Sequence, residues 1–248
     1  MRILVLQHEA VEHPGSFRQM LAEDGHEWVP VELDAGETPP PLDGFDALWV
    51  MGGPMDVWQE DRFPWLRMEK ALIREAVADR GMPFLGLCLG HQLLAEALGG
   101  DCGPGTPEIG VMPVHFTEAG KDSVFLDGIE GPFDCLQWHG AEVKRPPEGA
   151  AILATSEACP IQAMSWGTRA LSLQFHLEVE PDTVHTWSHI AEYRTALEQQ
   201  LGPEGLAAID RDAAARMDAF QRTAERVYIN WLQAAASAED HGPRRVTG

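Results

Sequence analysis

Cys88 lies between two glycines, in a Gly-x-Cys-x-Gly segment at residues 86–90. The apolar residues before it favour a strand, and the apolar spacing after it favours a helix. A sharp turn between the two crowds the residues two before and two after its centre, so glycine is favoured at both places. A cysteine there lies at a helix N-terminus, which stabilises a thiolate. The segment predicts a nucleophilic cysteine on a strand–turn–helix elbow; the alternative is a buried structural cysteine.

His176 and Glu178 end a stretch of alternating apolar residues much later in the chain, at residues 171–178. Alternation is typical of a strand, in which residues two apart face the same side. A histidine base and the carboxylate that orients it need such an arrangement. Alone, the two side chains would more often be a solvated surface pair. Together with Cys88, they predict a cysteine–histidine–glutamate catalytic triad.

Gly52 and Gly53 follow another apolar stretch, residues 45–51, which is predicted to be a strand. A glycine turn at the carboxyl edge of a sheet exposes unobstructed backbone N–H groups. We expect one of these groups and the N–H of Leu89 to bind the oxygen of a tetrahedral intermediate. The alternative is an ordinary loop between a strand and a helix.

Four segments of the chain resemble motifs of the class I (triad) glutamine amidotransferase family. They are Met-Gly-Gly-Pro at residues 51–54, Gly-Leu-Cys-Leu-Gly-His-Gln at 86–92, Trp-His-Gly at 138–140 and Gln-Phe-His-Leu-Glu at 174–178. The resemblance extends over roughly residues 1–180, in the order that the family uses. It implies that Cys88 is the nucleophile, His176 the base and Glu178 its orienting partner. The chain departs from the family at Leu177, where proline is usual.

The resemblance also implies roles for residues around the nucleophile. Gly53 and Leu89 would form the oxyanion hole, and Gln92 would help to hold the glutamyl backbone of the substrate. For His139 a purely structural role in a turn is an almost equal alternative. The remaining candidates for substrate binding are Gly52, Trp138 and His139.

Other segments resemble the free-standing, GMP-synthase-like branch of the family, which is also similar to γ-glutamyl peptidases. They lie at residues 12–15, 63–66, 108–110 and 137–140. Neither a Ser-Gly-Gly-x-Asp loop nor a Walker phosphate loop occurs in the chain. The resemblance therefore implies an amidohydrolase that releases ammonia from glutamine for a separate synthase subunit. The alternatives are a partner-free γ-glutamyl peptidase or hydrolase and a catalytically silent regulatory protein of the same fold; the complete set of triad residues opposes the last.

Composition excludes several classes of protein. A formal net charge of −21 opposes nucleic-acid binding, because phosphate groups need cationic partners. No apolar run approaches the roughly 20 residues that a membrane span requires. The four cysteines lack paired spacing and no secretory segment opens the chain, so we expect a cytoplasmic protein. We expect no cofactor and no metal, since His185 and His189 have no third ligand in view.

The order of the predicted elements indicates an α/β fold. We expect an open, mostly parallel central sheet with helices on both faces, the flavodoxin-like fold that the resemblance implies. Strands are predicted at residues 3–7, 28–33, 45–51, 82–87, 111–116, 133–138, 151–154 and 161–166, and helices at 15–23 and 65–80.

Three regions are predicted along the chain: an amidotransferase domain at 1–200, a C-terminal helical extension at 201–236 and a disordered tail at 237–248. Within the extension, apolar residues at three-and-four spacing predict a single helix over 203–231. Its apolar stripe would dock on the chain's own domain. The alternative is a subunit contact, with a second copy in a homodimer or with a synthase.

Overall fold

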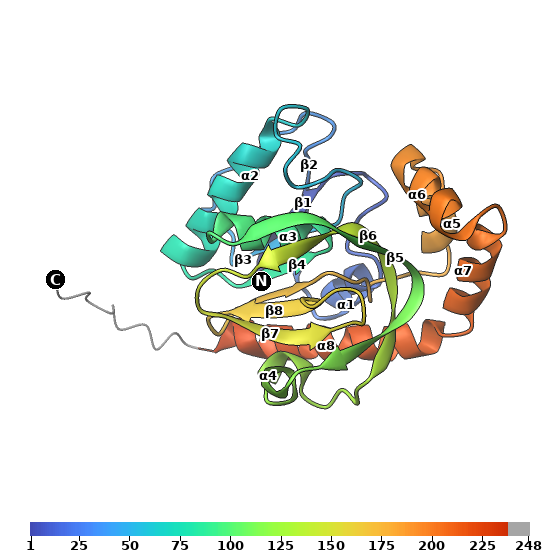
Figure 1. Cartoon of the computed structure of the whole chain (residues 1–248). Helices are drawn as coiled ribbons and strands as arrows, with labels where there is room; N and C mark the ends of the chain where they lie inside the picture. Colours follow the sequence, from blue (N-terminus) through green and yellow to red (C-terminus); the bar gives the residue numbers. More distant parts are fainter. Residues whose placement is uncertain (238–248) are drawn as a thin grey trace.

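The computed structural model describes residues 1–237, so the predicted tail lies outside the described residues except for its first position. One sheet of nine strands has the order β2-β1-β3-β4-β9-β8-β7-β5-β6 (Figure 1). The strands from β2 to β9 in this order pair in parallel. The remaining pairs are antiparallel. The predicted α/β fold is confirmed, with a parallel half that carries the elbow and an antiparallel half that closes the sheet.

The strands are β1 (Arg2–Gln7), β2 (Glu27–Glu32), β3 (Ala47–Val50), β4 (Phe84–Leu87), β5 (Asp101–Phe116), β6 (Phe133–Arg145), β7 (Ala150–Thr155), β8 (Ala163–Trp166) and β9 (Ala170–Leu173). The α-helices are α1 (Phe17–Glu23), α2 (Trp65–Arg74), α3 (Leu89–Ala97), α4 (Glu118–Lys121), α5 (Thr183–Trp187), α6 (Ala191–Leu201), α7 (Gly205–Ala214) and α8 (Met217–Ala236). A π-helix, η1 (Glu75–Asp79), continues α2, and a 3-10 helix, η2 (Val124–Leu126), precedes β6.

The parallel strands are buried on both faces, which explains why they appear in the sequence as continuous apolar runs. In β1, Ile3 and Val5 pack in the cluster that contains residues of α1 and α8. Leu4 and Leu6 face the opposite way, into the cluster that contains residues of α2 and α3. Because side chains alternate across a strand, each strand contributes to both layers. The prediction of helices on both faces of the sheet is therefore confirmed.

The C-terminal region differs from the single helix predicted over residues 203–231. The chain forms α7 and α8 with a turn at Ala215 and Arg216 between them. The apolar stripe meets two neighbours: Ile209 packs beside β5 and β6, whereas Trp231 packs under the parallel strands. At the turn between the two helices, Arg216 Nε donates to Asp134 Oδ2 of β6 over 2.7 Å.

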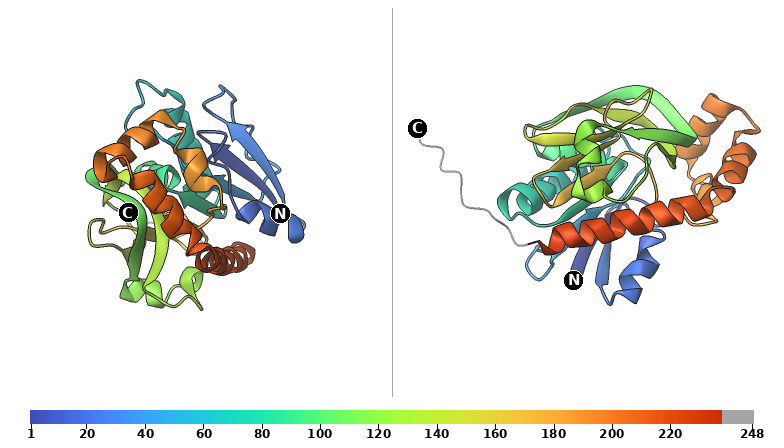
Figure 2. Two further views of the ribbon diagram at one scale, coloured as in Figure 1. Left: turned by 90° about the vertical axis from the view of Figure 1, so that its right-hand side faces the viewer. Right: turned by 90° about the horizontal axis from the view of Figure 1, so that it is seen from below.

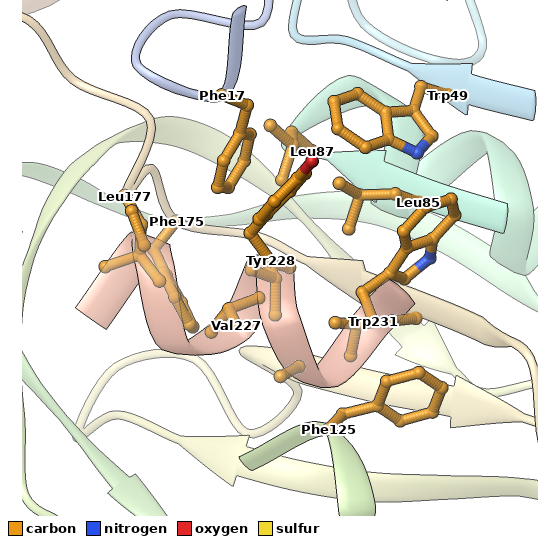
Figure 3. Close-up of a cluster of buried hydrophobic side chains, with 14 of the residues drawn as sticks. Phe17, Trp49, Leu85, Leu87, Phe125, Phe175, Leu177, Val227, Tyr228 and Trp231 are labelled. Carbon is orange, nitrogen blue, oxygen red and sulfur yellow. The ribbon is translucent and has the colours of Figure 1, made fainter. Parts of the chain in front are cut away.

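Helix α8 completes the hydrophobic core of the sheet. It runs along one face as a single long helix (Figure 2). Its Trp231 points toward Trp49 of β3 and Leu85 of β4, and its Tyr228 lies beside Phe17 of α1 (Figure 3). The Trp231 ring is fully buried, and its Nε1 donates to the Phe84 carbonyl over 2.9 Å. The apolar stripe of α8 is therefore occupied within this chain.

Several other predicted elements have different bounds, among them one helix and one strand. The helix predicted over residues 65–80 is α-helical only to Arg74 and then widens into η1. The strand predicted at 111–116 belongs to β5, which begins at Asp101 and forms a long antiparallel pair with β6. The first half of β5 was not predicted because it contains Pro104 and Pro107, and proline has no backbone N–H to donate to a neighbouring strand. A register shift between Pro104 and Glu108 accommodates this part of the strand.

Candidate active site

Cys88 occupies the turn between β4 and α3 in a strained backbone conformation, with φ 50° and ψ −102°. Among the described residues, Cys88 is the only one other than glycine that has a positive φ. Its own N–H is fixed by a bond of 2.8 Å to the Leu173 carbonyl of β9. A Cβ on Gly86 would lie 2.6 Å from the Gly90 carbonyl, and one on Gly90 would lie 2.1 Å from the Val50 carbonyl. Cys88 therefore lies on a strand–turn–helix elbow, and the packing around this turn leaves no room for a Cβ at Gly86 or Gly90.

His176 and Glu178 are buried beside Cys88. His176 Nδ1 lies 2.6 Å from Glu178 Oε1, and the second carboxylate oxygen accepts the Leu177 N–H over 3.0 Å. Burial lowers the pKa of His176, but the interactions with Glu178 and with the neighbouring Cys88 outweigh burial and raise the pKa well above its usual value. Since Nδ1 is occupied by Glu178, Nε2 is the nitrogen left for the thiol. The three predicted side chains are therefore brought together.

The strand predicted over residues 171–178 is shorter than expected. β9 ends at Leu173, and His176 makes only an isolated bridge to Leu136 of β6. The His176 N–H donates to the Leu136 carbonyl over 2.8 Å, which draws this segment away from β4 toward β6. His176 and Glu178 meet because of this irregular segment, and not because they share a face of a strand.

A cavity of about 220 Å³ opens at Cys88. The sequence-predicted residues on its wall are Gly53, Cys88, Leu89, Gln92, Trp138 and His139. Gly52 does not line it; a Cβ at Gly52 would lie 2.0 Å from the buried Glu12 Oε2. The glycine turn is therefore packed from behind at Gly52, and the cavity is bordered by the next residue, Gly53.

Gln92 belongs to a short chain of amides that ends at the thiol. Its Nε2 donates to Gln174 Oε1 over 3.1 Å and to the Ala141 carbonyl over 3.3 Å. Gln174 Nε2 in turn lies 3.6 Å from Cys88 Sγ as a donor. Gln174 was not predicted as a site residue, although it begins the segment that carries His176. The sequence feature that could have indicated Gln174 is a polar side chain directly after an apolar strand.

His139 lines the cavity but is also tied into the sheet. Its Nδ1 lies 3.0 Å from the Ala141 carbonyl, and its Nε2 lies 3.2 Å from Glu108 Oε2 of β5. Gln162 Nε2 donates to the same carboxylate oxygen over 2.7 Å. These contacts fix the orientation of the ring, so the structural alternative for His139 has direct support alongside its place in the cavity.

Four further polar side chains near the glycine turn were missed by sequence reasoning: His8, Glu12, Glu69 and Tyr193. Tyr193 of α6 lines the cavity and donates its hydroxyl to Glu12 Oε1. Burial raises the pKa of Glu12 to about 7, although His176 and Tyr193 act to lower it. Glu69 had a recognisable signal, because it lies on the buried face of α2 between Leu66 and Ile73.

The described part of the chain offers neither a metal site nor a membrane-spanning helix. It contains no group of three or more His, Cys, Asp or Glu side chains placed to hold a metal ion. The rings of His185 and His189 lie 4.8 Å apart without such a third ligand. Within residues 1–237, no helix combines the length and apolar character needed to cross a membrane.

The fold and the site together define an α/β protein with a cysteine on a strand–turn–helix elbow, beside a buried histidine–glutamate pair. The family model described as glutamine amidotransferase class-I matches residues 16–187. The chain belongs to the class I glutamine amidotransferase family, which confirms the family predicted from its motifs. This membership supports a role as a glutamine amidohydrolase.

Individual relatives agree with this assignment. The chain is 34% identical over 189 residues to the glutamine amidotransferase-like protein YfeJ of Salmonella typhimurium, covering 74% of this chain and 78% of the relative. It is 34% identical over 159 residues to one of the subunits of the glutamine-hydrolyzing GMP synthase of Sulfurisphaera tokodaii, covering 63% and 78%. A glutamine amidotransferase structure from Thermotoga maritima has a TM-score of 0.83 and 27% identity, covering 96% of this chain and 99% of that one.

Proposed function

We propose that this protein is a cysteine-triad amidohydrolase that cleaves the γ-glutamyl amide of glutamine through a thioester on Cys88. The observation that carries the proposal is the pairing of a strained elbow cysteine with a buried histidine whose other nitrogen is held by Glu178. Such a histidine is oriented to accept the thiol proton and is stabilised once it carries that proton. Family membership supplies the substrate class.

The reaction follows from these contacts. His176 Nε2 takes the Cys88 proton while the sulfur attacks the amide carbon, and the carbonyl oxygen becomes an oxyanion. The N–H groups of Gly53 and Leu89 are proposed to bind that oxygen; the N–H of Leu89 begins α3 and has no partner within the helix. His176 returns the proton to the leaving nitrogen, ammonia departs and a γ-glutamyl thioester remains. Water activated by His176 then releases glutamate and restores the thiol.

The substrate's amino-acid end is proposed to lie in the cavity between α3, β6 and α6. Gln92, Trp138 and His139 border this space and provide amide, indole and imidazole surfaces. Gly52, which the resemblance had placed among the substrate contacts, does not line the cavity and packs against Glu12 behind the cavity wall. The cavity, at about 220 Å³, has room for a small amino-acid substrate.

Two destinations for the nitrogen are compatible with this chemistry. Relatives include subunits of glutamine-hydrolyzing GMP synthases, which supports release of ammonia for a separate synthase subunit. A partner-free hydrolase of γ-glutamyl amines or peptides is the second candidate, and it is favoured by the glycine turn, whose Gly52 carbonyl is held by His8 in the isolated chain. A reducing compartment, such as the cytoplasm, fits the free state of all four cysteines.

A labelling experiment tests the nucleophile. The glutamine analogue 6-diazo-5-oxo-norleucine should form one adduct on Cys88, located by mass spectrometry of peptides. Cys88→Ala should lose at least about a thousandfold of amidase activity and all labelling. Cys159→Ala is a matched control, because burial raises the pKa of that thiol to about 12, and it should remain active. Label on another cysteine, or an active Cys88→Ala protein, would contradict the proposal.

A further inference from the structure

A second histidine–glutamate pair lies behind the glycine turn. The His8 ring, at the end of β1, is fully buried. Its Nδ1 lies 2.6 Å from the Gly52 carbonyl oxygen, and its Nε2 lies 2.9 Å from Glu69 Oε1 of α2. The ring also stacks on Trp65, with 5.4 Å between the ring centroids. His8 is thus held on both ring nitrogens and on one face.

The partners of His8 determine its protonation. A carbonyl oxygen only accepts hydrogen bonds, so Nδ1 must carry a proton and donate to the Gly52 carbonyl. An imidazolium ring can donate from Nε2 to the Glu69 carboxylate at the same time. Burial lowers the pKa of His8, but Glu69, the Gly52 carbonyl and the nearby Glu12 outweigh burial and raise it. The Gly52 carbonyl therefore accepts a charge-assisted hydrogen bond, which is stronger than a neutral one.

The orientation of the next N–H follows from peptide geometry. The Gly52 carbonyl and the Gly53 N–H belong to one planar trans peptide, in which they point in opposite directions. In the sheet, β3 lies between β1 and β4, so His8 and Cys88 follow the strands on either side of the glycine turn. A carbonyl held toward His8 consequently directs the Gly53 N–H toward the side of Cys88. Gly53 also lines the cavity at Cys88.

We propose that His8 and Glu69 are positioning residues that hold the Gly52–Gly53 peptide in the orientation needed for an oxyanion hole. This inference rests on the proposed function. In the isolated chain the oxyanion hole is then already formed, and no partner has to reorder the glycine turn. The carboxylate of Glu12 packs against the other side of Gly52, where even a Cβ would be excluded. The chain should therefore turn over substrate alone, whatever later receives the nitrogen.

The test uses two variants of the full chain, His8→Leu and Glu69→Gln. We expect kcat for glutamine to fall by about tenfold to about a hundredfold, less than for loss of a whole oxyanion-hole donor, while KM changes by less than about threefold. Inactivation by 6-diazo-5-oxo-norleucine should slow by a similar factor, because its carbonyl occupies the oxyanion hole. Alkylation of Cys88 by iodoacetamide should keep its wild-type rate, since displacement of iodide forms no oxyanion.

Asn230→Ala provides a matched control. Asn230 is buried on α8 and donates Nδ2 to the Phe125 and Asp127 carbonyls, so its loss weakens a buried carbonyl contact far from Cys88. This variant should be less stable but unchanged in both chemical rates. Glu69→Gln keeps the shape of its side chain, and it decides the question if His8→Leu does not fold.

The outcomes separate the two levels of proposal. An active wild-type enzyme whose His8 and Glu69 variants keep their kcat and inactivation rates would overturn the positioning role alone. Equal slowing of iodoacetamide alkylation would also overturn it, since the thiol and not the glycine turn would then be disturbed. A wild-type chain with no turnover and no label on Cys88 would instead overturn the proposed function.

Discussion

Two buried histidine–glutamate pairs lie near the glycine turn and Cys88, and they differ in the group that faces the second ring nitrogen. In one, His176 is held by Glu178 at 2.6 Å; in the other, His8 is held by Glu69 at 2.9 Å. In both pairs burial lowers the histidine pKa, and the glutamate contact outweighs it and raises the pKa. The first ring faces a thiol, which can give up a proton. The second faces the Gly52 carbonyl, which cannot.

The difference shows that a carboxylate partner by itself does not make a histidine a base. It fixes the ring and stabilises its proton in both pairs. In the proposed mechanism, the ring next to the thiol takes up a proton and returns it later. In the proposed positioning role, the ring next to the peptide oxygen keeps its proton and acts as a fixed donor. Variants of each pair can break or sharpen this contrast, from the largest expected effect to the smallest.

Removing the ring that faces the thiol should have the largest effect. We expect His176→Ala to lower kcat/KM for glutamine by about a thousandfold, close to the loss in Cys88→Ala, because the proton then has no acceptor. Steady-state ammonia release measures this. A loss no larger than that of His8→Leu would remove the distinction between the two rings.

Glu12 lies between the two pairs and should give a pH-dependent effect on stability. Its pKa rises from 4.5 to about 7 on folding, with burial as the main cause. The unfolded chain therefore releases this proton at lower pH than the native chain, and native stability falls as pH rises between those two values. Relative to wild type, Glu12→Gln should gain about 3 kcal/mol of unfolding free energy between pH 4.5 and pH 8.

Urea unfolding of both proteins at a series of pH values measures this difference. A constant offset is expected as well, because glutamine changes the contact with the Tyr193 hydroxyl. Only the part that varies with pH reports on the carboxyl group. A difference that stays the same from pH 4.5 to pH 8 would show that Glu12 does not titrate as the buried environment requires.

The carboxylate of the first pair should matter less than its histidine. In the proposed mechanism, Glu178 orients the ring and stabilises its charge but transfers no proton. Glu178→Ala should therefore be less impaired than His176→Ala by one to two orders of magnitude, roughly as for the third member of other triads. Assays of the two single variants under identical conditions decide this. Equal and negligible losses would mean that this pair does not act on Cys88.

The smallest expected effect is the deviation of the double variant from independent action of the two pairs. Glu178 acts on the thiol side and Glu69 on the glycine turn, and within the described part of the chain their side chains share no hydrogen-bond partner. The fold-losses of Glu178→Ala and Glu69→Gln should therefore multiply in the double variant to within about threefold. If the double variant were as active as the less active of the two single variants, both pairs would serve one function.

Much of the site could be predicted from sequence because it depends on local geometry. An elbow cysteine needs glycine two residues before and after it, whatever surrounds the turn. In the structure, a Cβ at Gly86 or at Gly90 would collide with a backbone carbonyl. Continuous apolar runs likewise indicate the parallel strands, since each strand is buried on both faces. Cys88, His176 and Glu178 were recognisable because their motifs are short and occur in the order that the family uses.

Tertiary structure alone decided the rest. His8 and Glu69 are 61 positions apart, and neither has a sequence pattern that names the other. The wall of the cavity at Tyr193 depends on how α6 packs against the sheet. The apolar stripe of residues 203–231 predicted one helix, because spacing reports which residues are buried but not by what. At the break, Arg216 contacts Asp134 of β6, a partner that is near only once distant parts of the chain have come together.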